Sequence, residues 1–174
     1  KFSSSNLNLY LNKKTVATIN SIEDVESIDS LGDKNNKIRC HLKVDTGMSR
    51  MGCEYKDCKT IINKLKRSNK IHFEGIYTHL ACSENKESKE NLDQIELFQK
   101  IIDYVNDDNI KYHILNSGGI FNYNSNKLNF VRSGIALYGI SPLGKINKNL
   151  KPVMKLVAPV VLLKTINVGE PQPQ

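Results

Sequence analysis

The sequence contains no tryptophan, only four cysteines, and no apolar run long enough to span a bilayer. The cysteines, Cys40, Cys53, Cys58 and Cys82, form no CxxC pair and no Cys/His spacing typical of a zinc site. No signal peptide is recognisable. We therefore expect reduced thiols, no bound metal, no contact with a membrane and a cytoplasmic location.

Positive charge is in excess but is not concentrated. The 25 Lys and Arg residues outnumber the 18 Asp and Glu residues and give a net charge of +7. A nucleic-acid-binding surface usually needs a basic stripe or a recognisable reading motif, and the sequence has neither. It therefore predicts no nucleic-acid partner, although the excess charge could help to attract an anionic ligand.

Two hydrophobic periods alternate along the chain, one typical of strands and one typical of helices. Strands are expected at residues 15–19, 38–44, 71–77, 112–115 and 130–138, and helices at 21–32, 55–68 and 91–106, with a short helical turn from Ser117. This β-α order predicts an α/β fold of parallel strands joined by right-handed crossovers. Such folds bind ligands at the carboxyl ends of their strands.

Polar side chains gather where the expected strands end. A lone histidine or arginine at such a point is more often structural than functional, but here four successive strands aim polar groups at one face. The residues are, strand by strand, Lys43, Asp45 and Arg50; His79; Asn116 and Ser117; and Arg132 and Gly134.

These residue types suit an anionic, aromatic, phosphorylated cofactor. The hydroxyl of Ser117 and the backbone N–H groups at Gly134 and Ile135 could bind a phosphate. Arg50 could hold a carboxylate or a phenolate oxygen through charge-assisted hydrogen bonds, and Arg132 would lie within reach of a bound ring. Spacing alone predicts no more than a phosphate-binding barrel.

Four segments resemble the alanine racemase family, in the family's order and near its spacing. They are His41-Leu42-Lys43-Val44-Asp45-Thr46-Gly47-Met48-Ser49-Arg50-Met51-Gly52, Tyr77-Thr78-His79-Leu80-Ala81, Asn116-Ser117-Gly118-Gly119 and Val131-Arg132-Ser133-Gly134-Ile135-Ala136-Leu137-Tyr138-Gly139-Ile140-Ser141-Pro142. The resemblance implies a pyridoxal 5'-phosphate enzyme that interconverts L- and D-alanine, supplies D-alanine for peptidoglycan, and works as a homodimer when full length. It implies a partial TIM-type (β/α)8 barrel, roughly strands 4 to 8, in residues 1–149, and the start of a C-terminal β domain in residues 150–174.

The resemblance also implies roles for single residues. Ser117 and the backbone of Gly134 and Ile135 would bind the cofactor phosphate, and Arg132 would hydrogen-bond the pyridine nitrogen. Among the other matching positions, His79 would support Arg132, Asn116 would belong to the cofactor site, Arg50 would contact the phenolic oxygen and the substrate carboxylate, and Lys43 would brace Arg50, in some family members as a carbamylated lysine.

The family's two catalytic bases have no counterpart here. The Schiff-base lysine belongs to an Ala-Asn-Ala-Tyr-Gly type motif after the first barrel strand, and this motif is absent. The second base is a tyrosine of the C-terminal domain, which we expect to lie outside the chain. We therefore interpret the sequence as an internal piece of an alanine racemase that is inactive by itself, with no catalytic residue among its 174 residues.

Other functions fit parts of the same pattern. Racemases of serine or lysine share the barrel and many of these motifs. The related decarboxylases use a carboxylate at the ring nitrogen, so Arg132 argues against them. A non-catalytic pyridoxal-phosphate-binding barrel would have no β domain, whereas the β-rich sequence from Lys151 predicts one. A phosphate-binding barrel with no link to pyridoxal is the least specific alternative.

Overall fold

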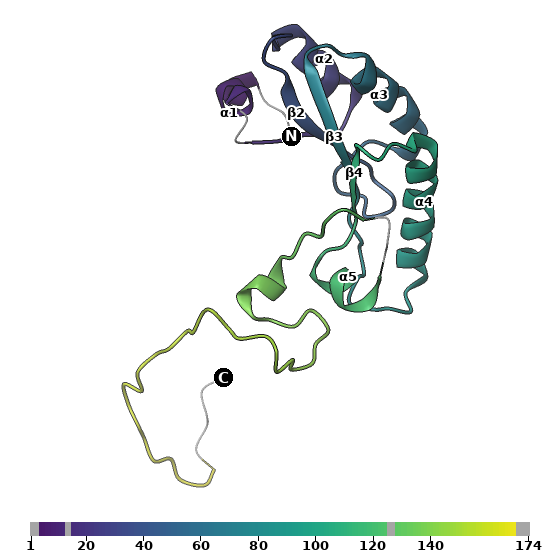
Figure 1. Cartoon of the computed structure of the whole chain (residues 1–174). Coiled ribbons are helices and arrows are strands. Elements are labelled where there is room, and N and C mark those ends of the chain that lie inside the picture. The colour runs from purple at the N-terminus through teal and green to yellow at the C-terminus, as the bar shows by residue number, and fades with distance from the viewer. Residues whose placement is uncertain (1–3, 13–14, 125–127, 170–174) are drawn as a thin grey trace.

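Strands and helices alternate along most of the chain. The computed structural model describes residues 4–12, 15–124 and 128–169. In chain order the elements are η1 (Ser4–Asn6), α1 (Leu7–Leu11), β1 (Ala17–Ile19), α2 (Ile22–Leu31), β2 (Ile38–Lys43), α3 (Tyr55–Arg67), β3 (Ile71–Tyr77), α4 (Lys89–Val105), β4 (Lys111–His113), α5 (Ser117–Asn122) and η2 (Ile135–Tyr138). The strands form one parallel sheet in the order β1-β2-β3-β4 (Figure 1). This is an α/β fold consistent with part of a barrel, and the assignment to strands 4 to 8 stays a prediction.

The helices follow the predicted periodicity. In α3 the buried residues are Cys58, Ile61, Ile62 and Leu65, spaced so that they share one helix face. Ser21 caps α2 and Ser88 caps α4, because each side chain accepts a hydrogen bond from the backbone N–H three residues later. The short helix α1 was not predicted, since its five residues are too few to show a helical period.

The two faces of the sheet differ in chemistry. Helices α2, α3 and α4 cover the convex face, whereas the short helix α1 lies on the concave side, near β2 (Figure 1). In β2 the residues that face the helices, Ile38, Cys40 and Leu42, belong to the buried hydrophobic core. The residues between them are polar and, because side chains alternate across a strand, they point to the concave face: Arg39, His41 and Lys43.

The prediction of a strand at residues 130–138 is wrong. Among the described residues, one backbone hydrogen bond joins this region to the residues just after β4, from Arg132 N to Leu115 O (2.9 Å), and another joins the preceding Asn129 N to Tyr112 O of β4 (3.1 Å). Beyond that point the N–H groups of Gly134 and Ala136 turn to the hydroxyl of Ser117 instead. The chain therefore leaves the sheet and forms the 3-10 turn η2.

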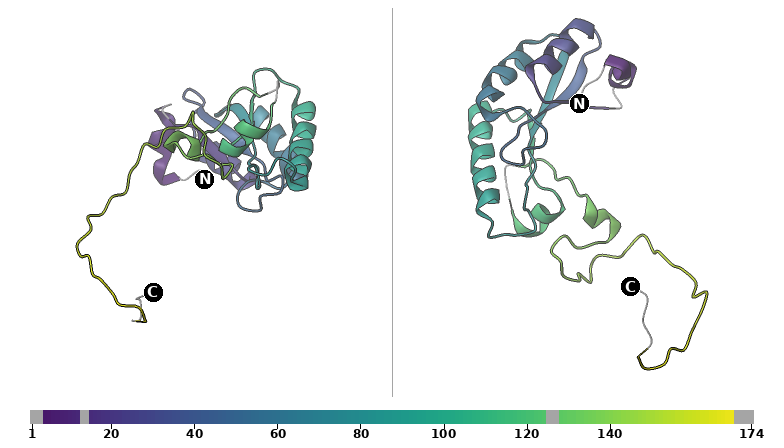
Figure 2. Two further views of the ribbon diagram at one scale, coloured as in Figure 1. Left: turned by 90° about the horizontal axis from the view of Figure 1, so that it is seen from below. Right: turned by 180° about the vertical axis from the view of Figure 1, so that it is seen from behind.

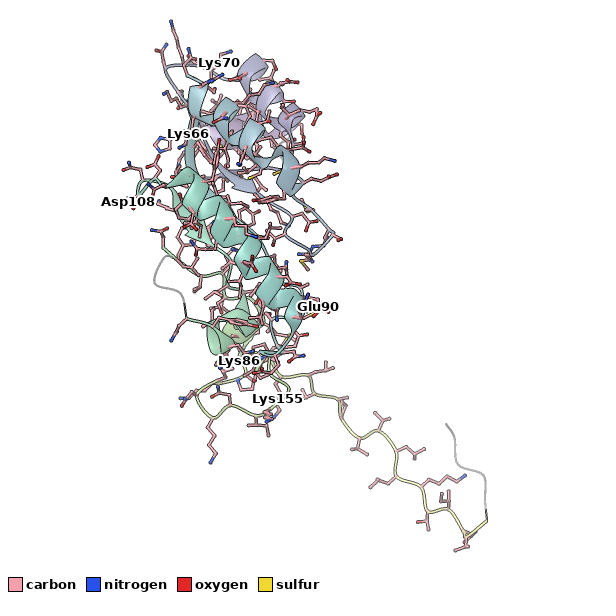
Figure 3. All side chains as sticks on the ribbon, turned by 90° about the vertical axis from the view of Figure 1, so that its right-hand side faces the viewer. Lys66, Lys70, Lys86, Glu90, Asp108 and Lys155 are labelled. Carbon is pink, nitrogen blue, oxygen red and sulfur yellow. The ribbon has the colours of Figure 1, made fainter. Side chains whose placement is uncertain are left out.

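The chain after η2 runs away from the sheet and the helices (Figure 2). Among the described residues from 139 to 169 there is no strand. Apolar side chains project from this segment on both sides (Figure 3), and Leu156 and Val161 are 97% and 90% exposed. The prediction that a β domain begins here stays a prediction, and residues 170–174 of it lie outside the described residues.

Candidate cofactor site

One carboxylate organises the loop that follows β2. Oδ1 of Asp45 accepts hydrogen bonds of 2.9, 2.9 and 3.1 Å from the backbone N–H groups of Gly47, Met48 and Ser49. Partial burial opposes ionisation of this carboxyl, but the three backbone donors together with Lys43 outweigh it and hold the pKa of Asp45 below its usual range. Asp45 is therefore a structural anion that shapes the loop rather than a proton carrier.

The same loop returns to the strand that it leaves. Cys53 N donates to Lys43 O and Asp45 N donates to Cys53 O, both at 2.9 Å. Gly52 sits at the close approach with φ of 119°, where a Cβ would lie 2.7 Å from the nitrogen of Asp45. The fold therefore requires glycine here, and the loop that carries Arg50 is tied to the carboxyl end of β2.

Lys43 and Arg50 differ in environment. Lys43 ends β2 and is only 7% exposed, whereas Arg50 is exposed. Burial, and then the positive charge of Arg50, lower the pKa of Lys43. The two side chains thus repel each other electrostatically while both are charged, so Lys43 can brace Arg50 only if it loses its positive charge.

Two buried residues that sequence reasoning missed hold the strand ends together. Nε2 of Gln94, on α4, donates to Thr46 Oγ1 (3.2 Å) and to His79 O (2.9 Å), and its Oε1 accepts from Ala81 N (2.9 Å). Thr46 in turn hydrogen-bonds Thr78 at 2.8 Å. Polar residues at the buried positions of an amphipathic helix, here Asn91 and Gln94, are the pattern that could have revealed this.

His79 lies between the end of β3 and two other predicted site residues. Its Nε2 lies 3.2 Å from Asn116 Nδ2, and its Nδ1 lies 3.3 Å from Arg132 Nη2. Burial, followed by the charges of Arg132, Arg50 and Lys43, lowers the pKa of His79 to about 4. The ring is therefore neutral near pH 7, and the cations around it favour an anion nearby.

Ser117, the first residue of α5, is the contact point between β4 and the segment near η2. Its Oγ accepts hydrogen bonds from Gly134 N (2.8 Å) and Ala136 N (3.2 Å). Sequence reasoning predicted Gly134 and Ile135 as backbone donors, whereas the structure brings Gly134 and Ala136 to this hydroxyl. Ile135 lines a surface hollow that Ser117 and Gly134 also border.

Arg132 is held by several acceptors, none of them a carboxylate. Nη1 donates to His113 Nδ1 (2.6 Å) and to His113 O (3.1 Å). Nη2 donates to Thr78 O (2.6 Å), to His79 Nδ1 and, more weakly, to Ile114 O (3.4 Å). Within the part of the chain that the structure describes, Nε has no acceptor and the guanidinium has no ion pair. One donor of the fork is therefore left for a ligand.

Most of the predicted cofactor-binding residues line one hollow of about 300 Å3, near the lower limit of small-molecule pockets. Of the seven predicted cofactor-binding residues, six border it and Arg50 does not. The lining residues are His79, Ser83, Glu84, Asn116, Ser117, Gly118, Arg132, Gly134, Ile135 and Pro142. The hollow is thus bordered both by the Ser117 hydroxyl, with backbone N–H groups close to it, and by the guanidinium of Arg132.

Comparison with known sequences places the chain in a family. A family model described as alanine racemase, N-terminal domain, matches residues 1–142. An alanine racemase of Francisella tularensis subsp. tularensis (strain SCHU S4 / Schu 4) is 30% identical over 159 residues, which cover 88% of this chain and 44% of the relative. The alanine racemase of Francisella tularensis subsp. novicida (strain U112) is 30% identical over 166 residues, with coverages of 92% and 46%. The chain therefore spans less than half the length of these relatives.

Solved structures show the same relationship. Alanine racemase from Bartonella henselae, crystallised with covalently bound pyridoxal phosphate, is 30% identical with a TM-score of 0.73, covering 87% of this chain and 42% of that one. Alanine racemase from Clostridium difficile 630 is 26% identical with a TM-score of 0.76 and the same coverages. In the described residues no helix is long and apolar enough to cross a membrane. From the site geometry and these matches together, we conclude that the chain belongs to the alanine racemase N-terminal domain family.

Proposed function

We propose that this chain holds pyridoxal 5'-phosphate in the hollow between α5 and η2, as part of an enzyme that interconverts L- and D-alanine. The observation that carries the proposal is the environment of Arg132. Its two terminal nitrogens are occupied by protein acceptors, its Nε–H is free among the described residues, and no carboxylate lies beside it. A pyridine nitrogen, a neutral single acceptor, fits that remaining donor.

The part of the hollow beside Ser117 suits the cofactor's phosphate. The hydroxyl of Ser117 and the N–H groups of Gly134 and Ala136 already converge within 3.2 Å. Backbone N–H groups and a hydroxyl are the donors that recur at phosphate sites. When bound, the cofactor draws electrons from the α-carbon of an amino acid and so makes its proton acidic. Arg132 donates a hydrogen bond without giving up its proton, which leaves the ring a weaker electron sink than a carboxylate partner would.

A chimera tests this function. Residues 15–142 of this chain would replace the matching region of the Francisella tularensis racemase, and the product would be assayed for conversion of L-alanine, L-serine and L-lysine to their D-forms. We expect turnover of alanine above the other two, and loss of turnover in an Arg132→Ala chimera. A folded chimera that binds the cofactor but racemises none of the three would contradict the proposed function, and a preference for serine or lysine would correct the substrate.

Lys43 is proposed to be carbamylated, as the resemblance implies. The supporting observation is its burial beside a like charge, which lowers its pKa and leaves more of the neutral amine. Reaction of that amine with carbon dioxide forms an N–C bond and releases a proton, and the product is an anion that would attract Arg50. A new carbonyl resonance in protein equilibrated with 13C-bicarbonate, absent in Lys43→Ala, is expected, and its absence at saturating bicarbonate would contradict the proposal.

Three further features are proposed from the resemblance. The complete enzyme would be a homodimer, would act in the cytoplasm to supply D-alanine for peptidoglycan, and would continue after residue 149 into a β domain. The exposed apolar side chains of residues 153–168 support the last of these, because such a segment needs a partner surface to be buried.

A further inference from the structure

His113 links Arg132 to a second histidine on the concave face of the sheet. Its Nδ1 lies 2.6 Å from Arg132 Nη1, and its Nε2 lies 2.9 Å from His41 Nδ1. His113 comes from β4 and His41 from β2, and the strand between them, β3, brings the two rings together. Neither residue belongs to the hollow that lies beyond Arg132.

The chemistry of the three groups determines the direction of these hydrogen bonds. A guanidinium can only donate, so Nδ1 of His113 must accept. A neutral imidazole that accepts at Nδ1 carries its proton on Nε2, which then donates to Nδ1 of His41. The chain of donors therefore runs from Arg132 through His113 to His41 in one sense only.

The ring of His113 is held on both faces. Tyr77 stacks on it with centroids 4.8 Å apart and an interplanar angle of 6°, and Phe130 lies on it at 4.3 Å and 30°. The hydroxyl of Tyr77 is itself hydrogen-bonded to Thr18 at 3.2 Å. A ring held in this way can direct a hydrogen bond accurately, since neither rotation nor displacement is free.

The ring of His41 also requires glycine at position 75 of β3, which it lies against. A Cβ at Gly75 would lie 2.6 Å from three atoms of the His41 ring, so only glycine allows this ring to lie across β3. The pairing between β2 and β3 is irregular between Cys40 and His41, which aligns His41 with Gly75 and passes over Glu74. The sheet is therefore shaped around this imidazole.

We propose that His113 is a positioning residue for Arg132. As a neutral imidazole with its proton on Nε2, it holds Arg132 Nη1, while His79 and the carbonyl of Thr78 hold Nη2, so that only the Nε–H faces the bound ring. His41 fixes the proton of His113 on Nε2. The identity of the bound ring as a pyridine rests on the proposed function. The direction of the hydrogen bonds from Arg132 to His113 and His41 is independent of it.

The other charged groups near these hydrogen bonds act on His41 rather than on His113. Glu74, ion-paired with Arg39 at 2.8 Å and with Lys111 at 3.9 Å, is the anion that lies nearest in the strand alignment. Burial lowers the pKa of both histidines, and for His113 the charges of Arg132 and His41 lower it further. Glu74 alone opposes this for His41, and its positive partners Lys111 and Arg39 counter it. Every group facing His113 thus favours the neutral ring.

Long-range 1H–15N spectra of the four histidines test the tautomer without any ligand. We expect His113 to stay neutral, with its proton on Nε2, from about pH 7 to about pH 5. Exposed His72 on β3 is the matched control in the same spectra. A proton on Nδ1 of His113, averaging between tautomers, or an imidazolium at neutral pH would overturn the proposal.

Two substitutions separate the hydrogen bond from the ring stack. His113→Asn keeps an acceptor near the position of Nδ1 but removes the ring, and His113→Phe keeps the ring between Tyr77 and Phe130 but removes the acceptor. The probe is pyridoxine 5'-phosphate, which lacks the aldehyde that would react with lysines. We expect His113→Phe to weaken its binding about tenfold, and His113→Asn to weaken it less.

The outcomes are distinguishable. Equal or reversed losses in the two variants would overturn the positioning role, whereas inorganic phosphate should bind both variants alike, because its contacts lie at Ser117. If the unaltered chain bound no pyridoxine 5'-phosphate, the proposed cofactor would be wrong, and the imidazole spectra would still decide the tautomer of His113. Should both variants fail to fold, the same spectra on the unaltered chain decide the proposal.

Discussion

Strand β2 separates two kinds of residue that are neighbours in the sequence. Ile38, Cys40 and Leu42 face the helices and are fully buried in the hydrophobic core. Arg39, His41 and Lys43 point the other way, to the side that α2, α3 and α4 do not cover (Figure 1). A parallel sheet usually carries apolar residues on both faces. This sheet uses one face for stability and reserves the other for polar contacts.

The difference teaches where substitutions should act. A change on the helix side removes apolar packing, so it should lower the free energy of unfolding and leave the site's chemistry intact in folded molecules. A change on the concave side, or at the loops that extend it, should weaken binding more than it weakens folding. The predictions below test this division.

Leu42→Ala is expected to cause the largest loss of stability. Leu42 has no exposed surface, so truncation leaves a cavity and should lower the free energy of unfolding by about 2–5 kcal/mol. Leu92→Ala is the matched control, because Leu92 is 54% exposed on α4 and should change stability little. Guanidinium titrations followed by circular dichroism measure both. Similar losses in the two variants would mean that the two faces are not divided as described.

Arg132→Lys is expected to weaken ligand binding more than it lowers stability, the reverse of Leu42→Ala. A lysine keeps the positive charge but cannot reproduce a fork that reaches His113, Thr78 and His79 together. Binding of pyridoxine 5'-phosphate, measured by calorimetry, should weaken at least about tenfold, with a smaller effect on stability. Arg67→Lys, at an exposed position of α3, is the control. Binding unchanged by Arg132→Lys would argue against a ring at this fork.

Much of this division could be predicted from the sequence. Period-2 and period-3.6 patterns depend on which side of an element is buried, so they placed β2, β3, α2, α3 and α4 to within two residues. Residues after strand ends meet at one edge of any parallel sheet, which is why His79, Asn116, Ser117 and Arg132 could be grouped in advance. Neither inference needs to know which strand residues lie opposite each other.

What could not be predicted depends on such alignment. His41 and His113 are 72 positions apart and meet across β3, where the irregular pairing of β2 and β3 aligns His41 with Gly75. Gln94 lies on the buried face of a helix and becomes informative only when Thr46, His79 and Ala81 are seen around it. Residues 130–138 have the composition of a strand, but the hydroxyl of Ser117 takes the N–H groups that would continue the pairing.

Ser117→Ala should have a moderate and selective effect. The hydroxyl accepts two backbone hydrogen bonds and is placed to donate to a phosphate, so its loss should weaken phosphate-bearing ligands by about 1 kcal/mol, roughly fivefold. Binding of pyridoxine 5'-phosphate and of pyridoxine should be compared in the same variant. Ser27→Ala, which removes an exposed hydroxyl from α2, is the control. Equal losses for both ligands would place the phosphate elsewhere.

The pH dependence of stability tests the concave face directly. Burial, with the charges of Arg132 and His41, lowers the pKa of His113 from 6.5 to about 3. Between these values the unfolded chain binds a proton that the folded chain excludes, so the free energy of unfolding must fall as the pH decreases through this window. His113→Asn should flatten that part of the pH profile, whereas His72→Asn, on the exposed surface of β3, should leave it unchanged. Denaturant midpoints measured from about pH 7 to about pH 4 give the slope. A profile as steep in His113→Asn as in the unaltered chain would show that the folded chain does not hold His113 neutral. The contacts on the concave face would then contribute less to the pH dependence of stability than they indicate.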